Sequence, residues 1–171
     1  MSRAEGYSLW LVPSGEAHTR LQDVVAQLSE RYHTPSFEPH ITLLGEVVGS
    51  ESELASKTRE LISAVQKFRV ELDSVDCREE YFKCLFLNVR ENDALRKANN
   101  TSKRIFGRHT DQTYMPHLSL LYGNFSPATK EEMIREIGNQ WSVCFAVESI
   151  HLFSANGGPE EWYRLAEFHL Q

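Results

Sequence analysis

The sequence predicts an α+β fold made of two similar lobes, with antiparallel sheets facing a central groove and helices on the outer faces. Two observations lead to this prediction. First, Pro39–Leu44 (PHITLL) and Pro116–Leu121 (PHLSLL) share one pattern: a proline, a histidine, an aliphatic residue, a hydroxyl residue and two more aliphatic residues. Second, the order strand, helix, histidine strand, helix, strand occurs twice in the 171 residues. We therefore expect one domain, residues 1–171, with pseudo-two-fold symmetry.

The first lobe is expected to cover about residues 7–78. A short apolar run from Tyr7 to Val12 precedes Pro13-Ser14-Gly15 and is typical of a strand followed by a turn. Aliphatic residues then recur at three- and four-residue steps from His18 to His33, which predicts an amphipathic helix. The lobe is completed by the histidine strand from Pro39, a helix that begins at Glu51 and an alternating strand from Phe68 to Val75.

The second lobe, about residues 79–155, repeats this order. Its predicted elements are a strand from Tyr81 to Val89, a helix from about Asn92 to Phe106, a histidine strand from Met115 to Tyr122, a helix from Ser126 to Ile137 and a strand from Ser142 to Ile150. A final strand, Trp162 to Leu170, follows Gly157-Gly158, and the residues around its start resemble those that open the second lobe. We interpret it as an edge or swapped strand.

Composition narrows the class of protein. A hydrophobic fraction of 41% and the lack of a run of about 18 apolar residues predict a soluble protein without a membrane span. The N-terminal residues show no secretory or transit signal, so we expect a cytoplasmic protein, and a monomer. A net charge of −6 argues against binding of long nucleic acids. The small basic cluster of Lys103, Arg104 and Arg108 is interpreted as a solvated face.

The cysteines and histidines do not indicate a metal site. Cys77, Cys84 and Cys144 form no CxxC pair, so we expect buried free thiols and no disulfide framework. A catalytic zinc would need a third ligand beside His40 and His117, and no HxH or HExxH pattern supplies one. We therefore predict that no metal or other cofactor is needed. Five other histidines have no repeated partner and are expected to be structural or exposed: His18, His33, His109, His151 and His169.

The repeated motif indicates acid–base chemistry. Side chains alternate faces along a strand, so His40 shares a face with Thr42, and His117 shares one with Ser119. The second histidine and the second hydroxyl residue each lie 77 positions after the first. Across a central groove, one imidazole can accept a proton while the other donates one. Hydrolysis of a phosphodiester needs both transfers, on opposite sides of phosphorus. The two hydroxyls would then donate hydrogen bonds to the non-bridging oxygens.

A single histidine on an apolar strand is more often a core residue, but two copies with the same neighbours favour catalysis. For Trp10 and Phe82, core packing and ligand binding both stay open.

The sequence resembles the two-histidine (2H) phosphoesterases, whose mark is a duplicated His-x-Thr/Ser with aliphatic flanks. The branch it resembles is the plant and fungal cyclic nucleotide phosphodiesterases. The resemblance rests on the two motifs and on three flanking stretches: Ser8–Pro13, Tyr81–Leu87 and Tyr114–Tyr122. It implies metal-free hydrolysis of ADP-ribose 1″,2″-cyclic phosphate, and of nucleoside 2′,3′-cyclic phosphates to 2′-phosphates. A role in tRNA splicing is a further implication.

Carried over by position, the resemblance implies that His40 and His117 are the catalytic pair and that Thr42 and Ser119 hold the phosphate. It also implies that Tyr122 lies against the phosphate and that Trp10 and Phe82 flank the groove, where they could stack on a base. Which histidine is the base stays open, and the segment after Asn156 carries no signature of the family.

Two alternatives are retained. One is an enzyme of the same superfamily that processes or joins RNA ends, which the charge of −6 disfavours. The other is a module that binds cyclic phosphates without turnover. Both histidines and both hydroxyls are present, which disfavours this second alternative.

Overall fold

The backbone of residues 3–171, taken from a computed structural model, repeats one order of elements. The first repeat comprises β1 (Tyr7–Leu11), α1 (Gly15–Tyr32), β2 (Ile41–Val47), α2 (Glu51–Ala64) and β3 (Phe68–Asp76). The second comprises β4 (Leu85–Val89), α3 (Asp93–Ile105), β5 (His117–Leu121), α4 (Pro127–Ile137) and β6 (Gln140–Val147), and is followed by β7 (Ser149–Ser154) and β8 (Tyr163–His169). Two 3-10 turns, η1 (Tyr81–Lys83) and η2 (Pro159–Glu161), precede β4 and β8.

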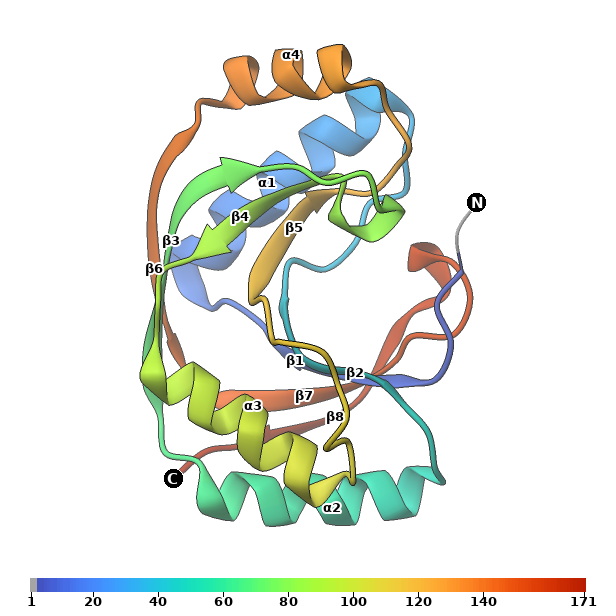
Figure 1. Cartoon of the computed structure of the whole chain (residues 1–171), viewed down its shortest axis with the longest axis vertical. Helices are drawn as coiled ribbons and strands as arrows, with labels where there is room; N and C mark the ends of the chain where they lie inside the picture. The colour runs from blue at the N-terminus through green and yellow to red at the C-terminus, as the bar shows by residue number, and fades with distance from the viewer. Residues whose placement is uncertain (1–2) are drawn as a thin grey trace.

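The strands form one curled antiparallel sheet in the order β6-β3-β4-β5-β2-β1-β7-β8, which confirms the predicted α+β class. The two halves of the sheet meet where β2 pairs with β5 through Ile41 and Leu118. The halves face each other and the helices lie outside them, with α1 and α4 over one half and α2 and α3 over the other (Figure 1). This arrangement leaves the concave side of the sheet for the groove.

The two halves of the sheet do not coincide with the two sequence repeats. β3 belongs to the first repeat but lies between β4 and β6 of the second. The last two strands, β7 and β8, extend the half that contains β1 and β2. α1 likewise packs against β5 and β6. The boundary expected near residue 78 therefore marks where the repeat begins again. One half of the sheet takes strands from both repeats, and the other combines β1 and β2 with the two strands that follow the second repeat.

The pairing of β2 with β5 carries the pseudo-symmetry. Ile41 and Leu118 are equivalent positions of the two motifs, and they are paired with each other. An antiparallel pair has a local two-fold axis perpendicular to the sheet. When equivalent residues pair, this axis relates the two motifs, so the histidines that precede Ile41 and Leu118 lie on either side of it and on the same face of the sheet.

Two predicted elements are wrong. Tyr81–Lys83 was expected to begin a strand but forms η1, because the Lys83 amide donates to the carbonyl of Glu80 and closes a tight turn. The single strand expected from Ser142 to Ile150 is divided at Glu148. Its first part, β6, pairs with β3, and its second part, β7, pairs with β1 in the other half of the sheet. A local pattern of apolar residues cannot show such a change of partner. The last strand, β8, lies at an edge, as expected.

The cysteines differ from the expectation of buried thiols. Cys84 is buried, Cys77 is half-buried and Cys144 is exposed. Cys144 is exposed because β6 is an edge strand whose alternate residues, Val143 and Phe145, face the core. Among residues 3–171, no helix is both long enough and apolar enough to cross a bilayer.

Candidate active site

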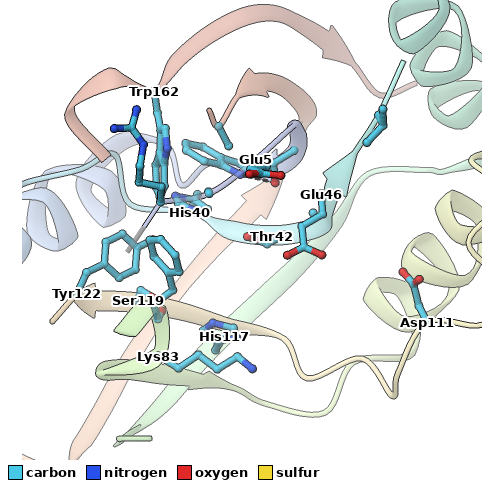
Figure 2. A pocket seen from close by; sticks show the side chains of 18 of the residues that line it. Glu5, His40, Thr42, Glu46, Lys83, Asp111, His117, Ser119, Tyr122 and Trp162 are labelled. Atoms are coloured by element: carbon cyan, nitrogen blue, oxygen red, sulfur yellow. Dashed lines mark hydrogen bonds between the residues drawn. The ribbon is translucent and has the colours of Figure 1, made fainter. Parts of the chain in front are cut away.

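A cavity of about 770 Å³ lies on the concave side of the sheet, and its lining includes every site residue that the sequence predicted. Figure 2 shows that His40 and Thr42 lie on one side of it and His117 and Ser119 on the other. The seven residues are Trp10, His40, Thr42, Phe82, His117, Ser119 and Tyr122. The five histidines without a repeated partner are not among the residues that line this cavity.

Each histidine is held by a carbonyl oxygen two residues before it. His40 Nδ1 lies 2.7 Å from the carbonyl oxygen of Glu38, and His117 Nδ1 lies 2.9 Å from that of Met115. A carbonyl oxygen only accepts hydrogen bonds, so Nδ1 must carry the proton in both rings. Nε2 is then the nitrogen that can take or give a proton, as acid–base catalysis requires. The identical contact in both motifs follows from the pseudo-symmetry.

The segment that holds His40 is itself anchored. The carboxylate of Glu38 lies 2.7 Å from Nε2 of His18 on α1. Glu38 therefore binds α1 through its side chain and His40 through its backbone. His18, which the sequence predicted as structural or exposed, supports the position of the imidazole in this way.

Burial lowers the pKa of both histidines. His40 is 7% exposed, and loss of hydration is the main reason that its pKa falls to about 3, with the nearby His117 lowering it further. His117 is half-buried, and its lowered pKa is due first to burial and then to neighbouring charges that include Lys83. Both rings are therefore neutral at pH 7 before a ligand binds. An anionic ligand between them would raise both pKa values.

Trp10 supports His40. The indole and the imidazole are stacked at 3.5 Å with an interplanar angle of 4°, and Phe153 is stacked on the indole at 3.8 Å. Two nearly parallel rings cannot share one face of an indole at these distances, so they cover its two faces. Trp10 Nε1 also donates to Ser8 Oγ at 2.7 Å, and the residue is only 2% exposed. Both faces of the indole are thus covered, which favours the packing role of the two that the sequence left open for Trp10.

Each hydroxyl residue lies near both histidines. It is two positions from one histidine along its own strand and opposite the other histidine on the neighbouring strand. Continuing the antiparallel register from Ile41 and Leu118 sets His40 opposite Ser119 and Thr42 opposite His117. Ser119 Oγ donates to the carbonyl oxygen of Phe82 at 2.9 Å. This bond fixes the hydroxyl on the η1 side of the cavity.

Aromatic rings gather at one end of the cavity. Tyr122 is 3% exposed and stacked on Phe37 at 3.8 Å, and burial raises the pKa of its phenol. Phe82 and Trp162 are both half-buried, and their ring centroids are 5.9 Å apart at an angle of 36°. Trp162 was not predicted as a site residue. The sequence similarity of Glu160–Arg164 to Glu79–Lys83 could have indicated it. Each of these segments contains or follows a 3-10 turn, and each places one aromatic ring, Trp162 or Phe82, at the cavity.

The opposite end of the cavity is polar. Arg108 Nη1 donates to the carbonyl oxygens of Gly45 and Glu46, each at 3.0 Å, and Arg108 Nε donates to Asp111 at 2.8 Å. Glu46 has a φ of 53°, which is unusual for a residue with a side chain. Arg108 thus holds a strained turn of β2 at the cavity, where the sequence had indicated a solvated face. Lys83, which also lines the cavity, lies beside His117 (Figure 2).

The arrangement can transfer protons at two points while donating hydrogen bonds to an anion between them. Within residues 3–171, no group of three or more histidine, cysteine or acidic side chains could hold a metal ion. The charged residues of the cavity lining are balanced, with Arg3, Lys83 and Arg108 against Glu5, Glu46 and Asp111.

Comparisons with known proteins indicate the family and the fold. Residues 5–168 match the family described as cyclic phosphodiesterase-like protein. A cyclic phosphodiesterase of Arabidopsis thaliana is 26% identical over 125 residues, which are 73% of this chain and 69% of that protein. The crystal structure of E. coli LigT without ligand is similar with a TM-score of 0.69 at 13% identity, over 99% of both chains. A Thermus thermophilus protein is similar with a TM-score of 0.66 at 17% identity, over 96% of this chain and 97% of that one.

Proposed function

This chain belongs to the cyclic phosphodiesterase-like family of 2H phosphoesterases, and on that premise we propose that it hydrolyses small cyclic phosphates without a metal ion. The proposed substrates are nucleoside 2′,3′-cyclic phosphates, opened to 2′-phosphates, and ADP-ribose 1″,2″-cyclic phosphate. The observation that carries the proposal is the pair of histidines. His40 and His117 flank a pseudo-two-fold axis, line one cavity, and both carry their proton on Nδ1.

In the proposed reaction His40 is the general base and His117 the general acid. Strong burial keeps His40 neutral, so its Nε2 has a lone pair for the attacking water. His117 is less buried, and the bound phosphate raises its pKa so that it carries a proton for the leaving sugar oxygen. The hydroxyl of Thr42 donates a hydrogen bond to a non-bridging oxygen, where negative charge increases, and the hydroxyl of Ser119 does the same once it turns away from the carbonyl of Phe82.

The size and lining of the cavity support a small nucleotide. Its volume of about 770 Å³ is typical of a small-molecule site. Phe82 and Trp162 are available to stack on a base at the aromatic end, once their rings separate by roughly 1 Å to admit it. E. coli LigT has been crystallised with 3′-AMP, with ATP and with NADP+. We extend binding of small nucleotides to this chain as part of the proposal, together with a cytoplasmic, monomeric protein and a role in tRNA splicing.

The test is hydrolysis of adenosine 2′,3′-cyclic phosphate and of ADP-ribose 1″,2″-cyclic phosphate in EDTA, with products identified by phosphorus NMR. His40→Ala and His117→Ala should each abolish turnover, because each removes one proton transfer. The matched control is His109→Ala, which removes an exposed histidine outside the cavity lining and should leave the rate unchanged. Appearance of the 3′-phosphate would contradict the proposed regiochemistry.

Two other results would favour the alternatives. Turnover of RNA ends but of neither small substrate, with a steep dependence on salt, would indicate an RNA-end enzyme, because contacts with several phosphates release counterions. Binding of the cyclic nucleotide without any product would indicate a binding module.

A further inference from the structure

The catalytic groups described above contain no permanent positive charge, although the proposed substrate is an anion. The two histidines are neutral at pH 7 before a ligand binds, and the hydroxyls of Thr42 and Ser119 are neutral as well. Three basic residues line the cavity within the part of the chain that the structure describes: Arg3, Lys83 and Arg108. One of these could supply the missing charge.

Two of the three are already paired. Arg3 has a side chain that is 68% exposed, and its Nη2 lies 3.2 Å from the carboxylate of Glu161. Arg108 donates to Asp111 and to two carbonyl oxygens of β2 at 2.8–3.0 Å. These bonds hold Arg108 against the backbone of β2, where its guanidinium stabilises a strained turn. Neither residue is free to move to a phosphate between the histidines without losing such contacts.

Lys83 differs because its backbone is fixed while its ammonium group is nearly free. Its amide donates to the carbonyl of Glu80 at 2.9 Å, and its carbonyl accepts from the amide of Arg78 at 2.9 Å. Its Nζ has one acidic partner among residues 3–171, the Glu80 carboxylate at 3.5 Å, and that side chain is 60% exposed. Such an exposed pair is weak. The ammonium group therefore keeps donors for a ligand.

The position of Lys83 is next to the reacting groups. Figure 2 shows its side chain running beside His117. Lys83 also lines an adjoining cavity of about 640 Å³, which shares Thr42 and His117 with the first. The preceding residue, Phe82, accepts the hydrogen bond of Ser119. One short turn, η1, thus positions both a hydroxyl donor and a cation beside the catalytic pair.

We propose that Lys83 is a further catalytic residue whose ammonium group contacts a non-bridging oxygen of the scissile phosphate. This inference rests on the proposed function. Negative charge on these oxygens increases toward the transition state, and a donor that is itself charged binds such an oxygen more strongly than a hydroxyl does. Lys83 forms no covalent bond and transfers no proton. Its contribution is a permanent positive charge, whereas His117 becomes charged only when the phosphate is bound.

A second consequence concerns His117. The charged groups that act on it are Lys83 and Arg78, which disfavour its protonated form, and Glu80, which favours it; the neutral ring of His40 lies across the cavity. Removing the charge of Lys83 should therefore raise the pKa of His117. A substitution that only disturbed packing would not be expected to shift this pKa in that direction.

The test compares Lys83→Gln with Lys83→Arg, and uses Lys97→Gln as a control. Lys97 is exposed on α3, and its substitution changes the net charge of the protein by the same amount. Three quantities are measured: kcat/KM for adenosine 2′,3′-cyclic phosphate, the Kd of inorganic phosphate by calorimetry, and the pKa of His117 by NMR. We expect Lys83→Gln to lower kcat/KM by about 10- to 100-fold, to weaken phosphate binding and to raise the pKa of His117. Lys83→Arg should keep most of the activity, and Lys97→Gln should match the parent.

Phosphate binding and the titration of His117 need no turnover, so they test Lys83 even where the parent fails to hydrolyse the nucleotide. An inactive parent whose phosphate affinity still falls in Lys83→Gln would contradict the proposed function and support the contact. Unchanged phosphate affinity and unchanged kcat/KM in Lys83→Gln would overturn the inference. A loss of activity with neither a change in phosphate affinity nor a rise in the pKa of His117 would also overturn it.

Discussion

Trp10 provides a sharp test of how the candidate active site is held together, because the sequence leaves both core packing and ligand binding open for it. The structure has it stacked between His40 and Phe153, with its indole nitrogen bonded to Ser8. We expect Trp10→Phe to lower kcat by about tenfold, since a smaller ring leaves the imidazole less firmly oriented and small misplacements of a catalytic group are costly. KM should change little. A residue that stacked on the base would instead affect KM.

The magnitude of the stability effect follows from burial. Trp10 is 2% exposed, and truncating a buried aromatic residue to alanine costs about 3–5 kcal/mol. That is a large part of the roughly 5–15 kcal/mol that stabilises a typical domain. Trp10→Ala should therefore be strongly destabilised, and Trp10→Phe, which keeps one stacked ring, should lose less. This is why the phenylalanine variant is preferred for kinetics.

The assay is steady-state kinetics of Trp10→Phe on adenosine and uridine 2′,3′-cyclic phosphates, with urea unfolding as the measure of stability. Comparing a purine with a pyrimidine separates the two roles, because support of His40 is independent of the base. A fall in kcat that is equal for both nucleotides is expected. A rise in KM that is larger for adenosine, with kcat unchanged, would refute the reasoning.

Two further predictions concern His40 and the cysteines. The imidazole of His40 has a pKa of about 6.5 in the unfolded chain and of about 3 in the folded protein. The neutral ring therefore contributes its full stabilisation of the fold above pH 6.5, and this stabilisation is lost as the pH falls toward 3. Urea unfolding should show that the parent loses about 2 kcal/mol more than His40→Asn between pH 7 and pH 5; equal losses would contradict the depressed pKa. Iodoacetamide should modify the exposed Cys144 before the buried Cys84, whose pKa is raised to about 11 by burial, as mass spectrometry of the digested protein would show. Faster labelling of Cys84 would be inconsistent with this order.

Several parts of the fold were predictable because they depend on local pattern. The helices of both repeats begin and end within a few residues of the predicted limits, since capping residues and apolar spacing act over one or two turns. Tyr81–Lys83 was not predictable in the same way. Its residues are typical of a strand, and the 3-10 turn depends on a backbone hydrogen bond and on the contact between the Phe82 carbonyl and Ser119.

The break at Glu148 shows a related limit. Residues on both sides of it are extended: burial alternates along β6, and Ile150–Ser154 of β7 are all buried. The chain nevertheless passes from one half of the sheet to the other at this residue. Strand partners are chosen by the packing of the whole sheet, which a periodic pattern does not contain.

The sequence alone was enough to identify the candidate site residues. Two copies of one motif, with equal spacing between histidine and hydroxyl, indicated His40, Thr42, His117 and Ser119, because the alternation of side chains on a strand is a property of the backbone. Only the tertiary structure decided how the motifs meet. The pairing of Ile41 with Leu118, the carbonyls that fix both tautomers, and the contact of Trp10 with His40 join residues of different elements. Such contacts depend on how the chain closes on itself, which no local pattern specifies.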